Sequence, residues 1–310
     1  MTKSTPAVNP VFVVGMNRGG STLLGNILCR HPNVVAPQHK LHWGCHESQV
    51  LRHMWYWGDL SDTRNFIQFL ELYSSGDFFK LAEGDKEYFY KHRPHDFYQF
   101  FFELMDQFAV RRGAKYWATK LDQEFYHHSG ELKRFLSRVE DRYDAPKFVG
   151  VLRDFPGVLK SHLRRQVTPD NVTISCFSAR QQWFALSQTM RYAMERRRIQ
   201  QIVSDWNGLL LGFNEVVDDL ENTAQRICSY LDLEYSPRML ERQFPRNTSF
   251  KDARERQQII APWQLALLDR LVRPVFEAVY PLGSVWFRLR SGRDRQRCPL
   301  WWRLLAEEKS

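Results

Sequence analysis

A short glycine-rich segment near the N-terminus holds residue types that bind anions. Gly15 and Gly20 are five positions apart with Arg18 between them, and the hydroxyl residues Ser21 and Thr22 follow. This spacing nearly fits the phosphate-binding pattern G-x-x-x-x-G-K-[ST], except that Ser21 replaces the lysine. Backbone N–H groups at a helix start attract anions, and the planar arginine fork suits phosphate or sulfate oxygens. The segment therefore predicts an anion site, and the plain alternative is a turn without a ligand.

The missing lysine narrows the choice of anion. In P-loop enzymes that act on nucleoside triphosphates, this lysine reaches the β- and γ-phosphates, and a hydroxyl group holds magnesium. A magnesium-binding carboxylate directly after an apolar strand is also missing, since Arg153 precedes Asp154 at the strand end where one could stand. A triphosphate with magnesium is therefore disfavoured.

A second pair of residues could bind another phosphate. Arg153 follows the apolar run 147–152, and Ser161 comes eight residues later, about two helical turns on. Pro156 lies near the first turn of this helix, where its missing N–H costs nothing. Arg153 and Ser161 placed in this way can share one phosphate, although a surface arginine and a solvated helix serine are the commoner outcome for each residue alone.

The elements that would position these residues alternate along the chain. Short apolar runs predict strands, and apolar residues at helical spacing predict the helices after them. The predicted strands are 11–14, 115–120, 147–152 and 209–213, and the helices with marked spacing are 23–28, 132–139 and 224–231. This alternation predicts an α/β fold with a mostly parallel sheet, whose ligands lie beyond the carboxyl ends of the strands. The loop 15–22, Lys120 and Arg153 all fall at such ends.

These motifs together resemble those of the sulfotransferases that use 3′-phosphoadenosine 5′-phosphosulfate (PAPS). The family's 5′-phosphosulfate loop is similar to "GMNRGGSTLLGNILCRHP", and its 3′-phosphate motif is similar to "KFVGVLRDFPGVLKSHLRR". Two later segments also resemble family segments, namely "GFNEVVDDLENTAQRICSYLDLEY" and "RNTSF". The resemblance covers roughly residues 10–50 and 115–285. It implies a three-layer, P-loop-like α/β fold with a central, mostly parallel sheet flanked by helices.

The resemblance also implies a domain organisation and a set of site residues. One sulfotransferase domain would span residues 1–310, with a helical insertion at about 50–112 and a C-terminal tail at about 288–310. The 5′-phosphosulfate would be held by Arg18, Gly19, Gly20, Ser21 and Thr22, and the 3′-phosphate by Arg153 and Ser161, with Ser249 and Lys251 as secondary candidates for the nucleotide. Lys120 would lie close to the transferred group.

Several positions depart from the family pattern. Asn17 replaces a proline and Ser21 replaces a threonine, both mild changes. Phe155 displaces the proline of the R-D-P motif by one position, which should barely move Arg153. Phe213 stands where the family has tyrosine in a Tyr-Glu-Asp segment, so no functional role is assigned to that segment.

The implied reaction is an in-line displacement at sulfur. A hydroxyl or amine of the acceptor would attack, and adenosine 3′,5′-bisphosphate would leave. Arg18 and the loop amides would stabilise the charge that builds on the leaving phosphate, and Lys120 would act on the sulfuryl oxygens. A general base is expected near the acceptor. Three residues compete for this role, Asp122, His42 and Glu47, because Lys40 occupies the position of the family's glutamate.

Composition limits the partners. The 310 residues carry a net charge of +9, and the five cysteines, Cys29, Cys45, Cys176, Cys228 and Cys298, form no C-x-x-C motif. This cysteine usage predicts reduced thiols in the cytoplasm. No signal peptide or membrane-spanning run is evident. We expect a small organic acceptor, with no nucleic acid, no metal and no membrane span, in a bacterial-type enzyme of specialised metabolism.

Some alternatives stay open at this point. A P-loop nucleotide kinase or NTPase with a degraded Walker A loop is the second functional reading. The segments 39–57 and 88–102 are expected to line the acceptor pocket because of their His, Trp and other aromatic residues. The C-terminal "CPLWWRLLAEEKS" is expected to dock onto the domain or onto a partner subunit, which leaves a homodimer open, with a membrane surface as the alternative.

Overall fold

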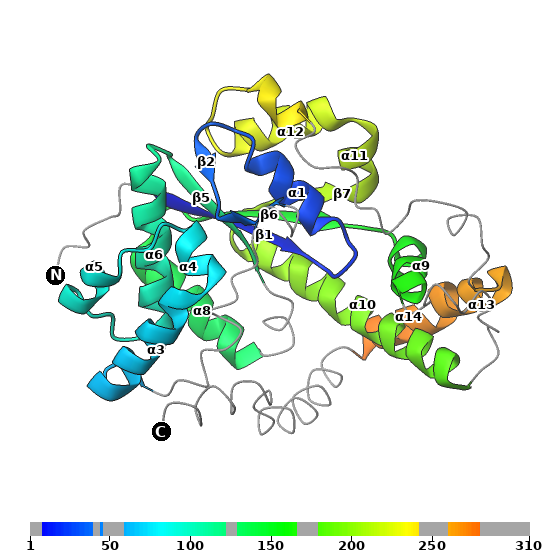
Figure 1. The fold of residues 1–310 in the computed structure, drawn as a ribbon. Helices are drawn as coiled ribbons and strands as arrows, with labels where there is room; N and C mark the ends of the chain where they lie inside the picture. The colour runs from blue at the N-terminus through cyan, green and yellow to red at the C-terminus, as the bar shows by residue number, and fades with distance from the viewer. Residues whose placement is uncertain are drawn as a thin grey trace.

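The computed structural model describes residues 8–39, 44–45, 59–121, 129–165, 179–241 and 260–279. Their central element is a five-stranded parallel sheet with the order β2-β5-β1-β6-β7 (Figure 1). The strands are β1 (Asn9–Gly15), β2 (Val34–Val35), β5 (Tyr116–Lys120), β6 (Lys147–Leu152) and β7 (Leu209–Gly212). β3 (Gln38–His39) and β4 (Gly44–Cys45) pair with each other as a separate, antiparallel two-stranded sheet.

The sheet register brings the carboxyl ends of the strands to one edge. Val13 pairs with Lys120 on β5, and Gly15 pairs with Val151 on β6. β1 is apolar and buried along nearly its whole length, as expected of a central parallel strand covered on both faces. The loop after β1, Lys120 and the residues after β6 therefore lie along a common edge.

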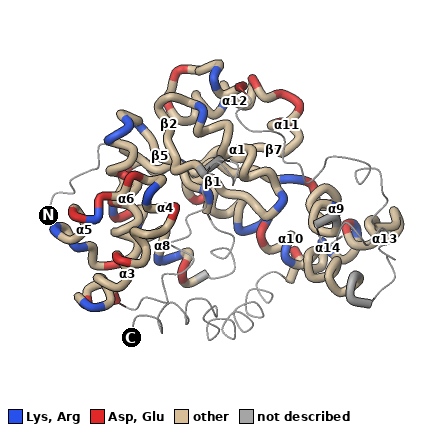
Figure 2. The backbone as a smooth tube through the Cα atoms, in the orientation of Figure 1, with Lys and Arg blue, Asp and Glu red and all other residues tan. Residues whose placement is uncertain are grey.

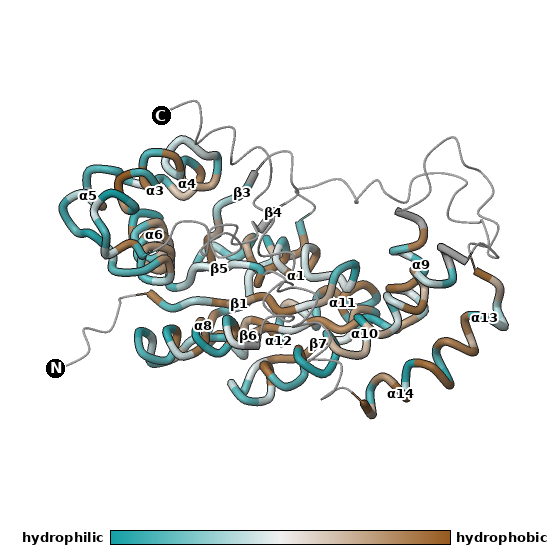
Figure 3. The backbone as a smooth tube through the Cα atoms, turned by 90° about the horizontal axis from the view of Figure 1, so that it is seen from below, coloured by the Kyte–Doolittle hydropathy of each residue, from teal (hydrophilic) through white to brown (hydrophobic). Residues whose placement is uncertain are grey.

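Successive side chains on each strand point to opposite faces, and each face is covered by its own helices. Phe12, Trp117 and Phe148 pack against the cluster that contains residues of α6 (Phe97–Arg111), α8 (Ser129–Arg142) and α10 (Ala179–Asp205). Val11, Val13 and Val149 pack against α1 (Ser21–Leu28) and α12 (Leu220–Tyr230). The two helical layers on either side of the sheet are visible in Figures 1 and 3. The predicted three-layer α/β fold is thus confirmed.

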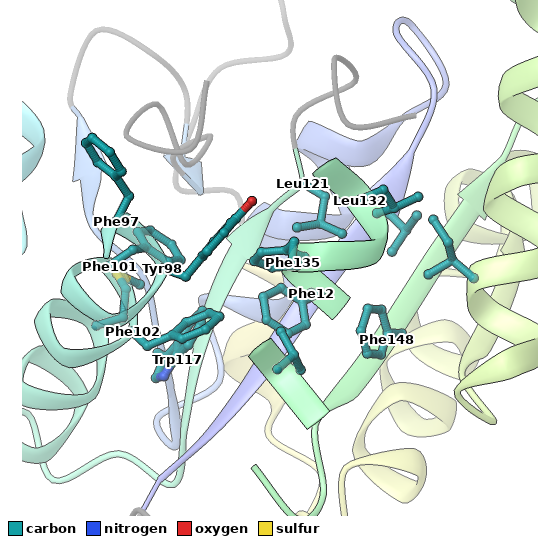
Figure 4. Packing of buried hydrophobic residues seen from close by; sticks show 14 of the residues in the cluster. Phe12, Phe97, Tyr98, Phe101, Phe102, Trp117, Leu121, Leu132, Phe135 and Phe148 are labelled. Carbon is teal, nitrogen blue, oxygen red and sulfur yellow. The ribbon is translucent and has the colours of Figure 1, made fainter. Parts of the chain in front are cut away.

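A group of aromatic rings forms the centre of the first layer. The ring of Phe12 lies 5.5 Å from that of Trp117, 5.3 Å from that of Phe135 and 5.0 Å from that of Phe148 (Figure 4). Edge-to-face pairs such as the first two are favoured by the charge distribution of aromatic rings. This core anchors β1, the strand that leads into the glycine loop.

The helices α3 (Thr63–Ser75), α4 (Asp77–Leu81), α5 (Lys86–Lys91) and α6 follow one another beside the sheet. Three of them begin at an aspartate that accepts a hydrogen bond from the third backbone N–H of the helix: Asp62, Asp85 and Asp96. The aromatic side chains at 89, 97, 98 and 100–102 are buried in the core. The prediction that segment 88–102 lines a pocket is therefore wrong for these rings, because they pack among helices α3–α6, against Phe135 on α8 and against Trp117 on β5.

A buried polar cluster ties α6 to β5 and α8. Asp106 accepts hydrogen bonds from the indole of Trp117 at 2.7 Å and from the hydroxyl of Tyr143 at 2.9 Å. Its second oxygen forms a charged pair with Arg142, with the shorter bond at 2.7 Å. Burial raises the pKa of Asp106, while Arg142 acts in the opposite direction. We call these four side chains the Asp106 cluster.

The remaining helices lie toward the carboxyl edge of the sheet. α9 (Phe155–Arg165) follows β6, and α11 (Phe213–Asp218) follows β7. A continuous helix built from α13 (Pro262–Leu267), the π turn η5 (Leu268–Val272) and α14 (Arg273–Ala278) packs against α10, where Arg196 and Glu277 form an ion pair at 3.6 Å. No helix in the described part of the chain is both long enough and apolar enough to cross a membrane.

Candidate anion-binding site

The loop between β1 and α1 has a compact, strained backbone. Arg18 has φ 65°, and Gly20, the N-cap of α1, has φ 104°. A hydrogen bond of 3.0 Å from the Gly19 N–H to the Met16 carbonyl closes the turn. Left-handed backbone is unfavourable for a residue with a side chain. The conformation of Arg18 therefore costs conformational free energy, and position 20 favours glycine. Gly20 also has no side chain to cap the first amides of α1, and such amides attract anions.

Arg18 and Ser161 meet although they are 143 residues apart in the sequence. The Nε of Arg18 donates a hydrogen bond of 2.9 Å to Oγ of Ser161 on α9. Ser161 is only 3% exposed. The structure therefore joins the two motifs that the sequence suggested separately: the glycine loop after β1 and the Arg–Ser element after β6.

Arg153 is held against the same loop. Its Nη1 donates a hydrogen bond of 3.4 Å to the Arg18 carbonyl, and its own carbonyl accepts one of 2.9 Å from the Tyr192 hydroxyl. The guanidinium also lies over the backbone of Gly157, where a Cβ atom would come within 2.6 Å of Nε. Glycine in the first turn of α9 thus makes room for Arg153.

Phe213 connects Arg153 with the glycine loop. The guanidinium carbon of Arg153 lies 4.4 Å from the centre of the Phe213 ring, a cation–π geometry. The same ring faces Gly20, where a Cβ atom would lie 2.5 Å from Cδ2. No functional role was predicted for Phe213 from the sequence. Its position directly after β7, at the carboxyl edge, was the available signal.

Lys120 reaches the loop from the end of β5. Its Nζ donates a hydrogen bond of 3.4 Å to Oγ1 of Thr22, in the first turn of α1. Three cationic side chains, Arg18, Lys120 and Arg153, therefore converge on this edge from the ends of three neighbouring strands. Such a concentration of positive charge next to a helix N-terminus favours a bound polyanion.

His162 supports the loop from α9, and this role was not predicted from the sequence either. The pKa of His162 is lowered to about 4, chiefly by burial and then by the charges of Arg191 and Arg18, while Glu195 opposes this shift. The ring hydrogen-bonds to the backbone of Asn17, the residue before Arg18. Glu195 is buried and forms an ion pair of 2.7 Å with Arg191. At neutral pH this imidazole is therefore uncharged.

Five of the predicted site residues lie outside the residues that the structure describes: His42, Glu47, Asp122, Ser249 and Lys251. Their proposed roles stay predictions, as does most of the expected pocket segment 39–57. The other predicted residues are at the edge of the sheet, in the β1–α1 loop, at the end of β5, after β6 or on α9.

The fold and the position of this loop define the class of protein. A parallel sheet with helices on both faces, and a glycine loop that leads from a central strand into a helix, make this a three-layer α/β protein of the P-loop-like class. The chain belongs to the sulfotransferase family, since the model of that family matches residues 10–237. Membership supports sulfuryl transfer as its general activity.

Several solved sulfotransferase structures are similar to the chain at low sequence identity. The sulfotransferase domain of the Synechococcus PCC 7002 olefin synthase is 14% identical, with 90% of this chain and 96% of that chain covered and a TM-score of 0.49. The sulfotransferase domain from the curacin biosynthetic pathway is 12% identical over 80% and 79%, with a TM-score of 0.46. Mouse sulfotransferase SULT7A1 complexed with PAP is 13% identical over 77% and 64%, with a TM-score of 0.38. No curated protein matches the sequence.

Proposed function

We propose that this protein transfers the sulfuryl group of PAPS to a hydroxyl or amine of a small organic acceptor. The observation that carries the proposal is the hydrogen bond between Arg18 and Ser161, which makes the glycine loop and the Arg153 element one site. PAPS has anionic groups at both its 5′ and 3′ ends. A site with two adjoining sets of donors suits such a nucleotide better than one with a single phosphate cradle.

The donors divide between the two ends of the nucleotide. The amides at the start of α1, with the hydroxyls of Ser21 and Thr22, would hold the 5′-phosphosulfate. Arg153 and Ser161 would hold the 3′-phosphate. Gly20 has no Cβ, and the ring of Phe213 occupies that space beside the helix start. Arg18 lies between the two sets and contacts Ser161 directly.

When bound, PAPS supplies a sulfuryl group on a phosphate that is a good leaving group. An acceptor atom would form its bond to sulfur as the bond to the bridging phosphate oxygen breaks, and the electron pair would stay on that oxygen. Arg18 and the first amides of α1 would stabilise this charge, since preorganised donors act most strongly where charge develops. Lys120, close to Thr22, would stabilise the sulfuryl oxygens.

The acceptor loses a proton in this reaction, so a base is needed near it. Asp122, His42 and Glu47 remain the candidates. His162 has a depressed pKa but is held against the loop backbone by its hydrogen bond to Asn17. We therefore give His162 a positioning role and not the role of base.

A nucleotide comparison tests the cofactor. We expect adenosine 3′,5′-bisphosphate to raise the melting temperature in EDTA more than ADP does, because only the bisphosphate places a group at Arg153. The Arg153→Ala variant should lose this preference while keeping the response to 5′-phosphates. Equal stabilisation by both nucleotides would refute the assignment, and stabilisation by ATP that requires magnesium would support the P-loop kinase or NTPase alternative.

A transfer experiment addresses the acceptor. Labelled PAPS incubated with the protein and fractionated metabolite extracts should label a small organic product. Labelling of a hydroxyl or of an amine distinguishes O- from N-sulfation. Binding of adenosine 3′,5′-bisphosphate without transfer to any fraction would keep the cofactor proposal and contradict the small-molecule acceptor. The cytoplasmic location remains a prediction from cysteine usage.

A further inference from the structure

One face of the helix formed by α13, η5 and α14 is apolar and exposed. Trp263, Leu267, Leu271, Val275 and Val279 recur at every fourth position along it, and we call them the apolar stripe. Trp263 is 61%, Leu271 63% and Val275 58% exposed. The other exposed positions of this helix are Pro262, Ala266, Arg270, Pro274 and Ala278, so Arg270 is the single charge among ten exposed residues. Contiguous apolar surface of this kind marks an interaction site.

The π turn helps to keep the apolar stripe on one side. Steps of four residues overshoot the 3.6-residue turn of an α-helix, so a strict four-residue repeat would wind around a regular helix. The wider turn of η5, Leu268–Val272, offsets part of that drift. The opposite side of the helix packs on α10 through the ion pair between Arg196 and Glu277. Hydrophobic residues recur along α13 and α14 in Figure 3.

We propose that the C-terminal segment 299–308 of the same chain packs on the apolar stripe. This segment lies outside the described residues and begins with Pro299. Most of the residues that follow Pro299 within it are apolar: Leu300, Trp301, Trp302, Leu304 and Leu305. Pro at a helix start and apolar residues four positions apart predict an amphipathic helix. Two helices with such faces can bury them against each other.

The length of the chain allows this contact. The helix from Pro262 to Ala278 is about 26 Å long at 1.5 Å per residue. The chain continues for 31 residues after Val279, the last member of the apolar stripe. The roughly 19 residues before segment 299–308 can span about 60 Å when extended, which is enough to return along the stripe. A tethered segment also binds at an effective concentration of about millimolar.

Charge favours this occupant over the other candidates. Glu307 and Glu308 end the apolar run of the segment and can pair with Arg270. A second copy of the stripe would bring another Arg270 and no carboxylate from its ten exposed residues. An anionic membrane would meet a single cationic side chain, Arg270, on the exposed face, whereas helices that bind such membranes are rich in Lys and Arg.

The native Cys298, next to Pro299, provides a direct test in the whole 310-residue chain. We would introduce Ala266→Cys or Ala278→Cys on the exposed face, oxidise, and identify linked peptides by mass spectrometry. An intramolecular disulfide to Cys298 is expected from at least one of these positions. It should be lost with Cys298→Ser and be at least ten times weaker from Val110→Cys, an exposed position on α6. A yield no higher than that of the Val110 control would overturn the proposal, and disulfides between two chains would indicate a second copy.

Limited trypsin digestion gives an independent readout. Leu271→Glu should speed cleavage after Arg303 at least tenfold, because the charged residue interrupts the stripe. The matched control Val110→Glu replaces a residue of similar exposure and should leave this cleavage unchanged. Equal cleavage in wild type and Leu271→Glu would contradict the contact. Sedimentation of the wild type with phosphatidylserine vesicles that is lost in Leu271→Glu would assign the stripe to a membrane surface instead.

Discussion

The Asp106 cluster and the loop site both gather polar side chains around the same sheet, but they do so with opposite charge arrangements. In the Asp106 cluster a single buried carboxylate collects donors from Trp117, Tyr143 and Arg142. At the loop, cationic side chains arrive from several strand ends and contact hydroxyl and carbonyl oxygens of the loop and its neighbours. In Figure 2 a basic segment (blue) followed by an acidic one (red) leads into α9.

The contrast separates the residues that hold the fold from those that we propose hold a ligand. Removing one partner of a buried ion pair destabilises the fold, because the other charge is left buried and unpaired. A cluster of positive charge attracts an anionic ligand, and the bound anion neutralises the repulsion within the cluster. Substitutions in the two regions should therefore affect different measurements.

The largest effect is expected in the Asp106 cluster. Asp106→Ala should lower the free energy of unfolding by about 3–5 kcal/mol, because Arg142 is left partly buried without its carboxylate. Urea denaturation measures this loss. Binding of adenosine 3′,5′-bisphosphate at a temperature where the variant is folded should change less than about twofold. A loss of affinity as large as the loss of stability would show that the two regions do not act separately.

Arg18→Ala should show the reverse behaviour. Transfer of label from PAPS to acceptors in an extract should fall by about 10²–10³-fold, as for removal of a donor that stabilises developing charge. The melting temperature should fall little, since alanine keeps the Cβ at this left-handed position and the substitution does not change the core. Arg18→Lys is the matched control and should recover little activity, because lysine lacks the planar fork. Full activity in Arg18→Lys would remove Arg18 from this role.

His162 links the loop to pH. The ordinary pKa of histidine is about 6.5, and that of His162 is lowered to about 4 in the folded protein. Between these values the unfolded chain binds the proton and the folded protein does not, so stability is complete above about pH 6.5 and falls as the pH drops toward 4. We expect about 1–2 kcal/mol of this loss between pH 7 and pH 5, after allowance for partial exposure. In the His162→Gln variant, the loss of unfolding free energy between pH 7 and pH 5, measured by urea denaturation, should be smaller by that amount. An unchanged loss would contradict a buried, neutral His162.

Phe213 should give the smallest effect. Phe213→Leu should weaken binding of adenosine 3′,5′-bisphosphate by about 3–10-fold, since a cation–π contact contributes about 0.5–1 kcal/mol and the ring also orients Arg153. Phe213→Tyr keeps the ring and should retain nearly full affinity. Binding of 5′-AMP, measured by the same calorimetry, should change less than binding of the bisphosphate. Equal losses for both nucleotides would argue against a specific action through Arg153.

The sequence predicted those parts of the molecule that depend on local patterns. The apolar runs at 11–14, 115–120, 147–152 and 209–213 correspond to β1, β5, β6 and β7. The helix that was predicted to contain Pro156 and Ser161 is α9. Strand β2 has only two residues, which is too short for periodicity to reveal. At residue 213 the strand prediction failed because α11 begins there.

The contacts within the site were harder to predict than its members. The loop residues and Arg153 could be found because each motif is local in the sequence. The ring of Phe213 against Gly20, and the hydrogen bond of His162 to Asn17, join segments more than 100 residues apart. For the aromatic residues of segment 88–102, a pocket was predicted where the structure has a buried core. Composition alone does not distinguish the wall of a pocket from a core.

Calorimetric titration of adenosine 3′,5′-bisphosphate and 5′-AMP in EDTA tests the central claim most directly, because the two ligands differ only at the 3′ position. Wild type should bind the bisphosphate at least tenfold more tightly, and Arg153→Ala should bind the two alike. Equal affinities in wild type, or an unchanged preference in Arg153→Ala, would contradict the assignment of Arg153 and Ser161 to a 3′-phosphate.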